Sequence, residues 1–152
     1  MTYQMMYPSP IGTLYIVCNQ THLLSISKKE QNVPYQQHDL LLKTIDQLDA
    51  YFKGQLKRFE IPLLFKDISP FAKKVYLETE KIPYGKTANY QDIAIKTGHK
   101  SAYRACGNAL NKNPFMIIIP CHRVISKSGQ IGGFAHNLSI KKVLLEIEGV
   151  SM

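Results

Sequence analysis

Met116-Ile117-Ile118-Ile119-Pro120-Cys121-His122-Arg123-Val124 carries more information about this chain than any other segment of its 152 residues. The apolar run at its start predicts a buried strand that is broken at Pro120, so that a thiol stands at the end of the strand. A cysteine reacts as the thiolate, and a nearby imidazole can take the thiol proton directly or through a water. Adjacent side chains often point apart and a buried cysteine is usually inert packing, so the Cys-His pair alone leaves a structural role open.

Further blocks of sequence stand around this segment in a characteristic order. In chain order they are Ile82-Pro83-Tyr84-Gly85-Lys86-Thr87 with Tyr90, then Arg104, Asn113-Pro114, the cysteine segment, Gly132-Gly133-Phe134-Ala135, and Leu144-Leu145-Glu146-Ile147-Glu148-Gly149. The pattern resembles the O6-alkylguanine-DNA alkyltransferase family. The likeness is close over residues 69–149 and looser toward the N-terminus, through Tyr51-Phe52-Lys53-Gly54 and Phe59-Glu60-Ile61-Pro62-Leu63.

The resemblance implies an α/β N-terminal domain over residues 1–66, made of a small antiparallel sheet plus a helix, which is structural and carries no chemistry. A mainly α-helical C-terminal domain with a winged helix-turn-helix would follow over residues 67–152, carrying DNA binding and the alkyl acceptor. Turn residues and hydrophobic periodicity predict individual elements without the resemblance. These are strands at residues 3–7, 13–18, 23–27 and 59–64, and helices at residues 39–53, 70–80, 89–96 and 101–112.

The family's chemistry is the transfer of an alkyl group from O6-alkylguanine in DNA, with O4-alkylthymine as a further candidate substrate. By resemblance Cys121 accepts the group irreversibly in a single turnover, and His122 deprotonates it through a water. Glu148 holds the imidazole and Asn113 holds the active-site turn. Only the resemblance separates Glu148 from Glu146. This arrangement predicts a Cys121 pKa below that of an ordinary thiol, because a protonated His122 would stabilise the thiolate.

The lesion pocket implied by the resemblance is formed by Pro120, Val124, Phe134, Ala135 and Lys141. Many members of the family have serine in place of Ala135, and two glycines commonly follow it. His136 and Asn137 stand there instead and add bulk to the loop, so the range of alkyl groups accepted is open. A solvated helix lysine is the alternative reading of Lys141.

The two predicted helices at residues 89–96 and 101–112 form a helix-turn-helix pattern. The second helix is rich in small residues, which permit close approach to DNA or, alternatively, to a packed helix. The resemblance implies that it enters the minor groove, with Arg104 filling the space left by a flipped nucleotide and Tyr90 contacting the phosphate and base. The predicted DNA contacts are completed by Lys100, Ala102 and Ala105.

Charge supports a polyanionic partner for the C-terminal half. Residues 1–65 contain six basic and five acidic residues, whereas residues 66–152 contain thirteen basic and six acidic residues. A basic surface attracts phosphates without regard to sequence. A merely soluble, lysine-rich surface is an equal alternative if charge is considered alone.

The remaining expectations concern context. Three cysteines without metal-ligand spacing predict free thiols in a reducing cytoplasm, with no metal and no cofactor. No signal peptide or membrane span is expected. A monomer bound to double-stranded DNA is the expected state.

Two other functions stay open at this point. One is a non-catalytic module that recognises alkyl lesions, although such relatives lack the reactive cysteine. The other is a thiol hydrolase or redox enzyme, which would leave Arg104 and the basic half unexplained and would lack a second cysteine at Cys-x-x-Cys spacing.

Overall fold

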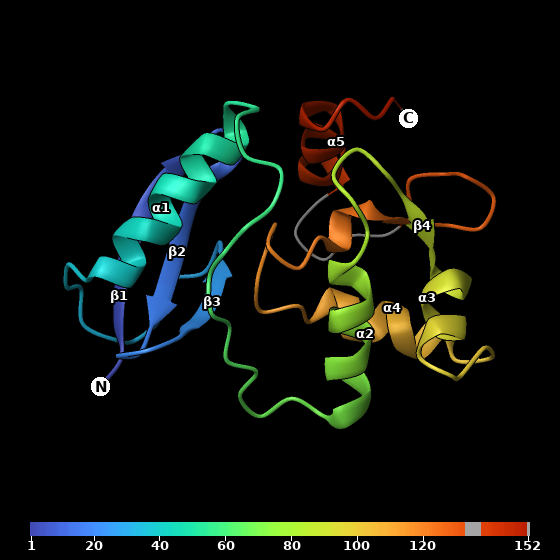
Figure 1. Ribbon diagram of the computed structural model, residues 1–152, viewed down its shortest axis with the longest axis horizontal. Coiled ribbons are helices and arrows are strands. Elements are labelled where there is room, and N and C mark those ends of the chain that lie inside the picture. Colours follow the sequence, from blue (N-terminus) through green and yellow to red (C-terminus); the bar gives the residue numbers. More distant parts are fainter. Residues whose placement is uncertain (133–137, 152) are drawn as a thin grey trace. The chain divides into compact units, whose positions relative to one another are not determined.

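The chain divides into two compact units, Met1–Lys66 and Asp67–Met152 (Figure 1). The structure is a computed structural model, and it describes residues 1–132 and 138–151. None of its described helices is long and apolar enough to cross a lipid bilayer.

The first unit is an antiparallel sheet with a helix on one face (Figure 1). Its elements are β1 (Tyr3–Ser9), β2 (Gly12–Cys18), β3 (Leu23–Ser27) and α1 (Asp39–Phe52). The β1–β2 hairpin closes between Ser9 and Gly12, where Gly12 has a φ of +104° that favours glycine. Helix α1 packs against β1 and β2, because Leu41 and Leu48 lie one above the other on its apolar face and are fully buried.

The predicted strand at residues 59–64 is wrong. Leu63 forms only an isolated parallel bridge with Leu23, in which Leu23 N donates to the Pro62 carbonyl at 2.8 Å and Leu64 N donates to the Leu23 carbonyl at 3.0 Å. Pro62 has no N–H to donate, so it interrupts any ladder on its own strand.

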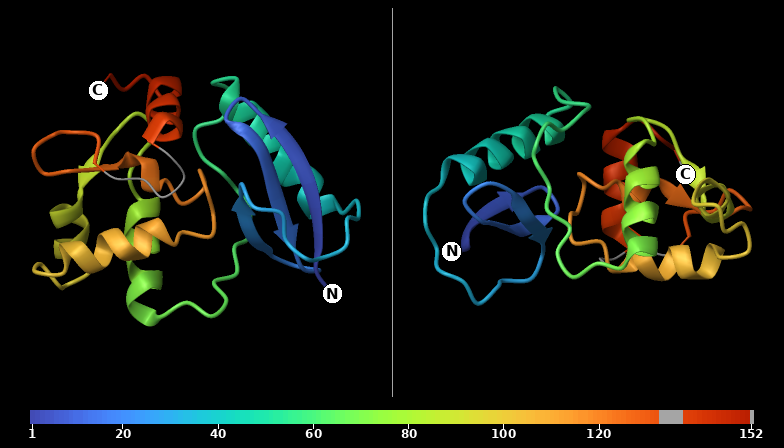
Figure 2. Two further views of the ribbon diagram at one scale, coloured as in Figure 1. Left: turned by 180° about the vertical axis from the view of Figure 1, so that it is seen from behind. Right: turned by 60° about the horizontal axis from the view of Figure 1, so that its bottom comes forward.

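The second unit is mainly helical (Figure 2). Its helices are α2 (Pro70–Glu80), α3 (Tyr90–Lys96), α4 (Tyr103–Asn111) and α5 (Leu138–Ile147). Ser69 caps α2 by accepting a hydrogen bond from Ala72 N at 3.1 Å, as the Ser-Pro sequence predicts. Asn89 and Asp92 form a capping box that starts α3. Helices α3 and α4 pack against each other and against α2, which gives a helix-turn-helix arrangement.

A short parallel sheet, which the sequence pattern did not indicate, joins the start of α3 to the cysteine segment. Strand β4 (Ala88–Asn89) pairs with β5 (Val124–Ile125), and the 3₁₀ turn η1 (Cys121–Arg123) leads directly into β5. The cysteine segment is thereby fixed to the helix-turn-helix by backbone hydrogen bonds.

The predicted strand at residues 116–119 is also wrong, because these residues form a compact buried turn. Ile119 N donates to the Phe115 carbonyl at 3.0 Å and Ile118 N donates to the Met116 carbonyl at 2.8 Å. Ile117 has a φ of +74°, a left-handed conformation that is strained for a β-branched residue. A short apolar run signals burial, but it does not distinguish a strand from any other buried segment.

Candidate active site

Cys121 begins η1 and is only 5% exposed. The side chain of Asn113, which follows α4, holds both the turn and the thiol. Its Nδ2 donates to the Ile119 carbonyl at 2.8 Å and lies 3.3 Å from Cys121 Sγ, while its Oδ1 accepts from Phe115 N at 2.9 Å. One buried amide therefore satisfies the backbone of an irregular turn and fixes the position of the sulfur.

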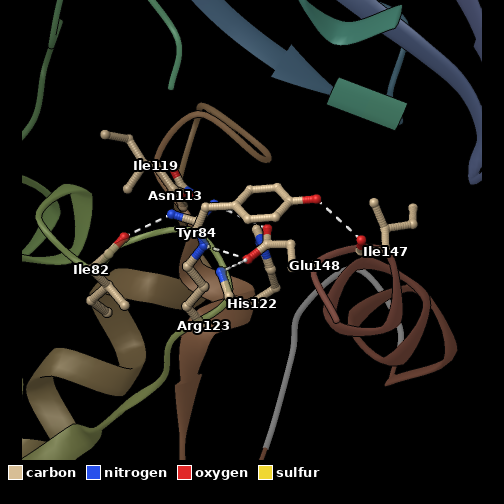
Figure 3. A network of polar contacts seen from close by, with 9 residues as sticks. Ile82, Tyr84, Asn113, Ile119, His122, Arg123, Ile147 and Glu148 are labelled. Atoms are coloured by element: carbon tan, nitrogen blue, oxygen red, sulfur yellow. Dashed lines mark hydrogen bonds and ion pairs between the residues drawn. The ribbon is translucent and has the colours of Figure 1, made fainter. Parts of the chain in front are cut away.

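His122 and Glu148 form a buried pair, shown in Figure 3, in which His122 Nε2 lies 2.6 Å from Glu148 Oε2. A contact this short with a carboxylate oxygen requires the proton on Nε2, so Nε2 donates. His122 Nδ1 is then the ring atom with a free lone pair when the ring is neutral. It is buried and has no hydrogen-bond partner among residues 1–132 and 138–151. Glu146, by contrast, is exposed, so burial separates the two carboxylates that the sequence alone did not.

Arg123 is a site residue that sequence analysis missed. It is 6% exposed, and it donates to Glu148 through Nε at 2.7 Å and through Nη2 at 3.0 Å. Its Nη1 donates to the Ile82 carbonyl at 2.7 Å (Figure 3). The available signal was its place between the histidine and Val124 in a segment expected to be buried, since a buried cation requires an anionic partner.

The block Ile82-Pro83-Tyr84-Gly85 contacts Glu148 and the residue before it. Gly85 N donates to Glu148 Oε1 at 3.2 Å, and Tyr84 Oη donates to the Ile147 carbonyl at 3.1 Å. Gly85 has a φ of +79°, and a Cβ there would lie 3.3 Å from the Glu148 carbonyl oxygen. A glycine is therefore required for the close approach that lets its N–H reach the carboxylate.

The resting electrostatics are those of a neutral thiol beside a neutral imidazole. Burial raises the pKa of Cys121 to about 11, although the Asn113 hydrogen bond and the charge of Lys141 act in the opposite direction. Burial also lowers the pKa of His122, against the raising effect of Glu148. The expectation of a lowered Cys121 pKa is therefore wrong for the DNA-free protein, because desolvation penalises the thiolate more than its neighbours stabilise it.

We expect Cys121 to remain protonated throughout the neutral range. Its ¹³Cβ chemical shift should keep the thiol value from pH 7 to about pH 10 and should change with a midpoint near the raised pKa of about 11. Cys121→Ser removes the signal and assigns it. A thiolate shift at pH 7 to 8 would contradict the dominance of burial.

Lys141 on α5 is fully buried, which excludes the reading of a solvated lysine. Its Nζ donates to the Val124 carbonyl at 2.7 Å, and burial lowers its pKa to about 8. Pro120 and Val124, which flank η1, are also buried. Phe134 and Ala135, together with His136 and Asn137, lie outside the described residues.

Four of the predicted DNA contacts lie on α4 and the turn before it. Arg104 is exposed, with its guanidinium 5.9 Å from the centre of the exposed Tyr103 ring. Ala105 and Lys100 are also exposed, and Ala102 is half-buried at the start of the helix. Helix packing is provided by the buried residues Cys106, Ala109 and Leu110, so packing does not account for Ala105.

Tyr90 begins α3, and its ring lies between two glycines. A Cβ on Gly107 would come within 3.8 Å of the ring, and a Cβ on Gly132 would lie 3.3 Å from both the ring and Tyr90 Oη. Gly107 is on α4 and Gly132 follows β5 in the chain. Gly132 therefore leaves the space that the Tyr90 ring occupies at the start of α3, whereas a Cβ on Gly107 would make only ordinary van der Waals contact with the ring.

Gly132→Ala is expected to displace Tyr90, and Gly129→Ala is the matched control. Both glycines have positive φ, +73° and +84°, so both variants should lose roughly 1–2 kcal/mol of stability from backbone strain. Only the Gly132 variant adds a Cβ in close contact with Tyr90 and Ser126 N, whereas nothing lies within 4 Å of a Cβ at Gly129. Chemical denaturation should show the larger loss for Gly132→Ala, together with weaker duplex binding. Equal losses of stability in the two variants would mean that the Tyr90 ring moves aside without destabilising the protein.

These features define a class: a protein in which a buried cysteine, adjacent in the chain to a histidine–carboxylate pair, shares one unit with a helix-turn-helix. Residues 70–150 match the 6-O-methylguanine DNA methyltransferase, DNA binding domain, and residues 2–65 match the 6-O-methylguanine DNA methyltransferase, ribonuclease-like domain. The chain is 38% identical to the methylated-DNA–protein-cysteine methyltransferase of Methanosarcina acetivorans, covering 97% of this chain and 98% of the relative. It is 36% identical to the constitutive methylated-DNA–protein-cysteine methyltransferase of Bacillus subtilis, and the match covers 99% of this chain and 98% of the relative.

The crystal structure of Mycobacterium tuberculosis OGT in complex with DNA superimposes with a TM-score of 0.89 at 35% identity, covering 96% of this chain and 92% of that one. The chain therefore belongs to the 6-O-methylguanine DNA methyltransferase family. It is a DNA-binding repair protein of the methylated-DNA–protein-cysteine methyltransferase type, which transfers an alkyl group to a cysteine. The predicted family and fold class are confirmed, and the hydrolase and redox alternatives do not fit.

Proposed function

We propose that Cys121 is the acceptor and that it takes the alkyl group of O6-alkylguanine in one irreversible step. The sulfur forms a bond to the alkyl carbon, the carbon–O6 bond breaks, and its electron pair stays on the guanine oxygen. The thiol proton passes to His122 Nδ1, directly or through a water, and a proton then returns to the base to give guanine. Glu148 steadies the imidazolium that forms in between.

The observation that carries this proposal is the placement of the three cysteines. Cys18 and Cys106 are buried, and burial accounts for their raised pKa values. Cys121 alone is bonded to a fixed amide and stands next to an imidazole–carboxylate pair. The C–S bond of the product thioether is stable to water and to thiols, so Cys121 is not regenerated and each protein acts once.

We assign DNA recognition to the exposed side of α4, with the duplex bound through its minor groove. Small residues at Ala102 and Ala105 allow the backbone to approach, Lys100 contacts phosphate, and Arg104 occupies the stack that the flipped lesion leaves. Tyr90 contacts the phosphate and the base edge. The reacting groups all belong to the unit of residues 67–152, the unit of residues 1–66 is structural, and the protein acts as a monomer.

The direct test is the stoichiometry of transfer. The protein is incubated with excess duplex containing O6-methylguanine, weighed intact by mass spectrometry, and digested for peptide mapping. One added methyl per protein, located on Cys121, is the expected result. Continued turnover, or a methyl on Cys18 or Cys106, would refute the assignment.

Arg104→Ala is expected to lower repair of a duplex about 10- to 100-fold, because flipping a base costs a few kcal/mol and the guanidinium offsets part of it. Transfer from the free base O6-methylguanine should be unchanged, since nothing has to be flipped. Lys112→Ala removes a cation from the other end of the same helix and serves as the control. An equal loss on duplex and free base would place Arg104 in the chemistry or the fold instead.

A further inference from the structure

The buried guanidinium of Arg123 meets the Glu148 carboxylate side-on. Its Nε bonds Oε1 at 2.7 Å and its Nη2 bonds Oε2 at 3.0 Å, so its planar fork sets the plane of the carboxylate. The opposite side of the guanidinium is held by the Ile82 carbonyl at 2.7 Å, and the Tyr84 ring centre lies 5.8 Å away (Figure 3). Arg123 is therefore itself held in position by a segment distant in sequence.

One carboxylate oxygen serves two donors. Glu148 Oε2 accepts from Arg123 Nη2 and, at 2.6 Å, from His122 Nε2. A permanent cation and a titratable ring thus share a single anion in a buried site. We propose that Arg123 is a positioning residue of the transfer reaction, which aims Glu148 at His122 and keeps the imidazole neutral until it receives the Cys121 proton. This inference rests on the roles proposed above for Cys121 and His122.

The charges that face His122 support this role. Glu148, at the end of α5, favours a protonated ring. Burial is the largest cause that lowers the pKa of His122, and the charges of Arg123 on η1 and Lys141 on α5 act in the same direction. Cys121, next to His122 in the chain, is a neutral thiol. Without Arg123, the Glu148 carboxylate would attract a proton to His122 more strongly, and burial and Lys141 alone would oppose it. A ring protonated on both nitrogens has no lone pair at Nδ1 for the thiol proton.

A purely structural role for Arg123 makes a different prediction. If the ion pair only stabilised the fold, removing it would lower stability and leave the titration of His122 and the pH dependence of transfer where they were. The two roles are therefore separated by a titration rather than by the loss of activity.

The experiment compares Arg123→Gln and Arg123→Lys with the wild type, and uses Lys127→Gln, an exposed cation in the loop after β5, as the control. The titration of His122 is followed by NMR, and methyl transfer from free O6-methylguanine is followed by intact mass across pH. In Arg123→Gln the His122 midpoint and the acid limb of the rate profile should both rise by about 1–2 pH units. Arg123→Lys keeps the positive charge but loses the two-pronged guanidinium contact with Glu148. The His122 titration midpoint should therefore stay unchanged, and the plateau rate of methyl transfer should fall about tenfold. Lys127→Gln should match the wild type in both measurements.

An unmoved His122 midpoint in folded Arg123→Gln, or a wild-type plateau rate in Arg123→Lys, would overturn the inference. If Arg123→Gln does not fold, the plateau rate of Arg123→Lys decides. Failure of the wild type to transfer methyl from the free base would refute the proposed function instead, and the His122 titration would still report on Arg123.

Discussion

Cys121→Ser is expected to abolish methyl transfer while leaving binding to undamaged duplex within about twofold of the wild type. The serine hydroxyl has nearly the size of the thiol and can still accept from Asn113, but it is a far weaker nucleophile for displacement at carbon. Binding should survive because the proposed DNA contacts lie on α3, on α4 and in the turn between them, and Asn113 still holds the turn at residues 115–119. Burying the more polar hydroxyl costs about 1 kcal/mol.

Intact mass after incubation with O6-methylguanine duplex measures the loss, and a binding titration with unmodified duplex measures what remains. Cys18→Ser and Cys106→Ser are the controls, because both thiols are buried away from an imidazole–carboxylate pair and should keep one methyl per protein. Detectable methylation of Cys121→Ser would mean that another residue accepts the group.

Glu148→Gln is expected to cost about 3–5 kcal/mol of stability, because it leaves the buried Arg123 guanidinium without its anion. Glu148 accepts hydrogen bonds from Arg123 at both oxygens, from His122 and from Gly85 N. A glutamine has one oxygen and one NH₂ group, so at least one donor of this set would face another donor. Transfer should slow on free base and duplex alike.

Denaturation of the folded protein and intact-mass transfer assays measure the two effects. Glu146→Gln makes the same chemical change at an exposed site two residues earlier, and it should stay within roughly 0.5 kcal/mol of the wild type. If the two variants behaved alike, the buried network around Glu148 would have no energetic role.

Local signals in the sequence predicted local structure well. The strand Leu23–Ser27 and the helix Pro70–Glu80 have the predicted bounds, because turn residues and a Ser-Pro N-cap mark the ends of these elements directly. The apolar run at residues 116–119 failed for the opposite reason. Its conformation depends on hydrogen bonds from the side chain of Asn113, which no periodicity can report.

The residues of the candidate site were predicted through a resemblance, whereas the direction of the Cys121 pKa shift was predicted wrongly. The residue types at Cys121 and His122 suggested the chemistry, but the depth of burial that reverses the expected Cys121 pKa is a property of the folded chain. Arg123 was missed because its partners, Ile82 and Glu148, lie 41 and 25 residues away. The roles assigned to Asn113, Arg104 and Tyr90 remain predictions.

The distances along the chain within the Glu148 network also set an order of assembly. Glu148 bonds Gly85 across 63 residues and His122 across 26, whereas α3 and α4 are joined by a short turn and pack on each other. Closing a long loop costs chain entropy before its contacts repay it, so neighbouring helices associate faster than distant segments. During refolding, the α3–α4 pair should therefore become protected from hydrogen exchange before Glu148 docks. A folding intermediate would then present the helix that we propose contacts DNA before burial has raised the pKa of Cys121.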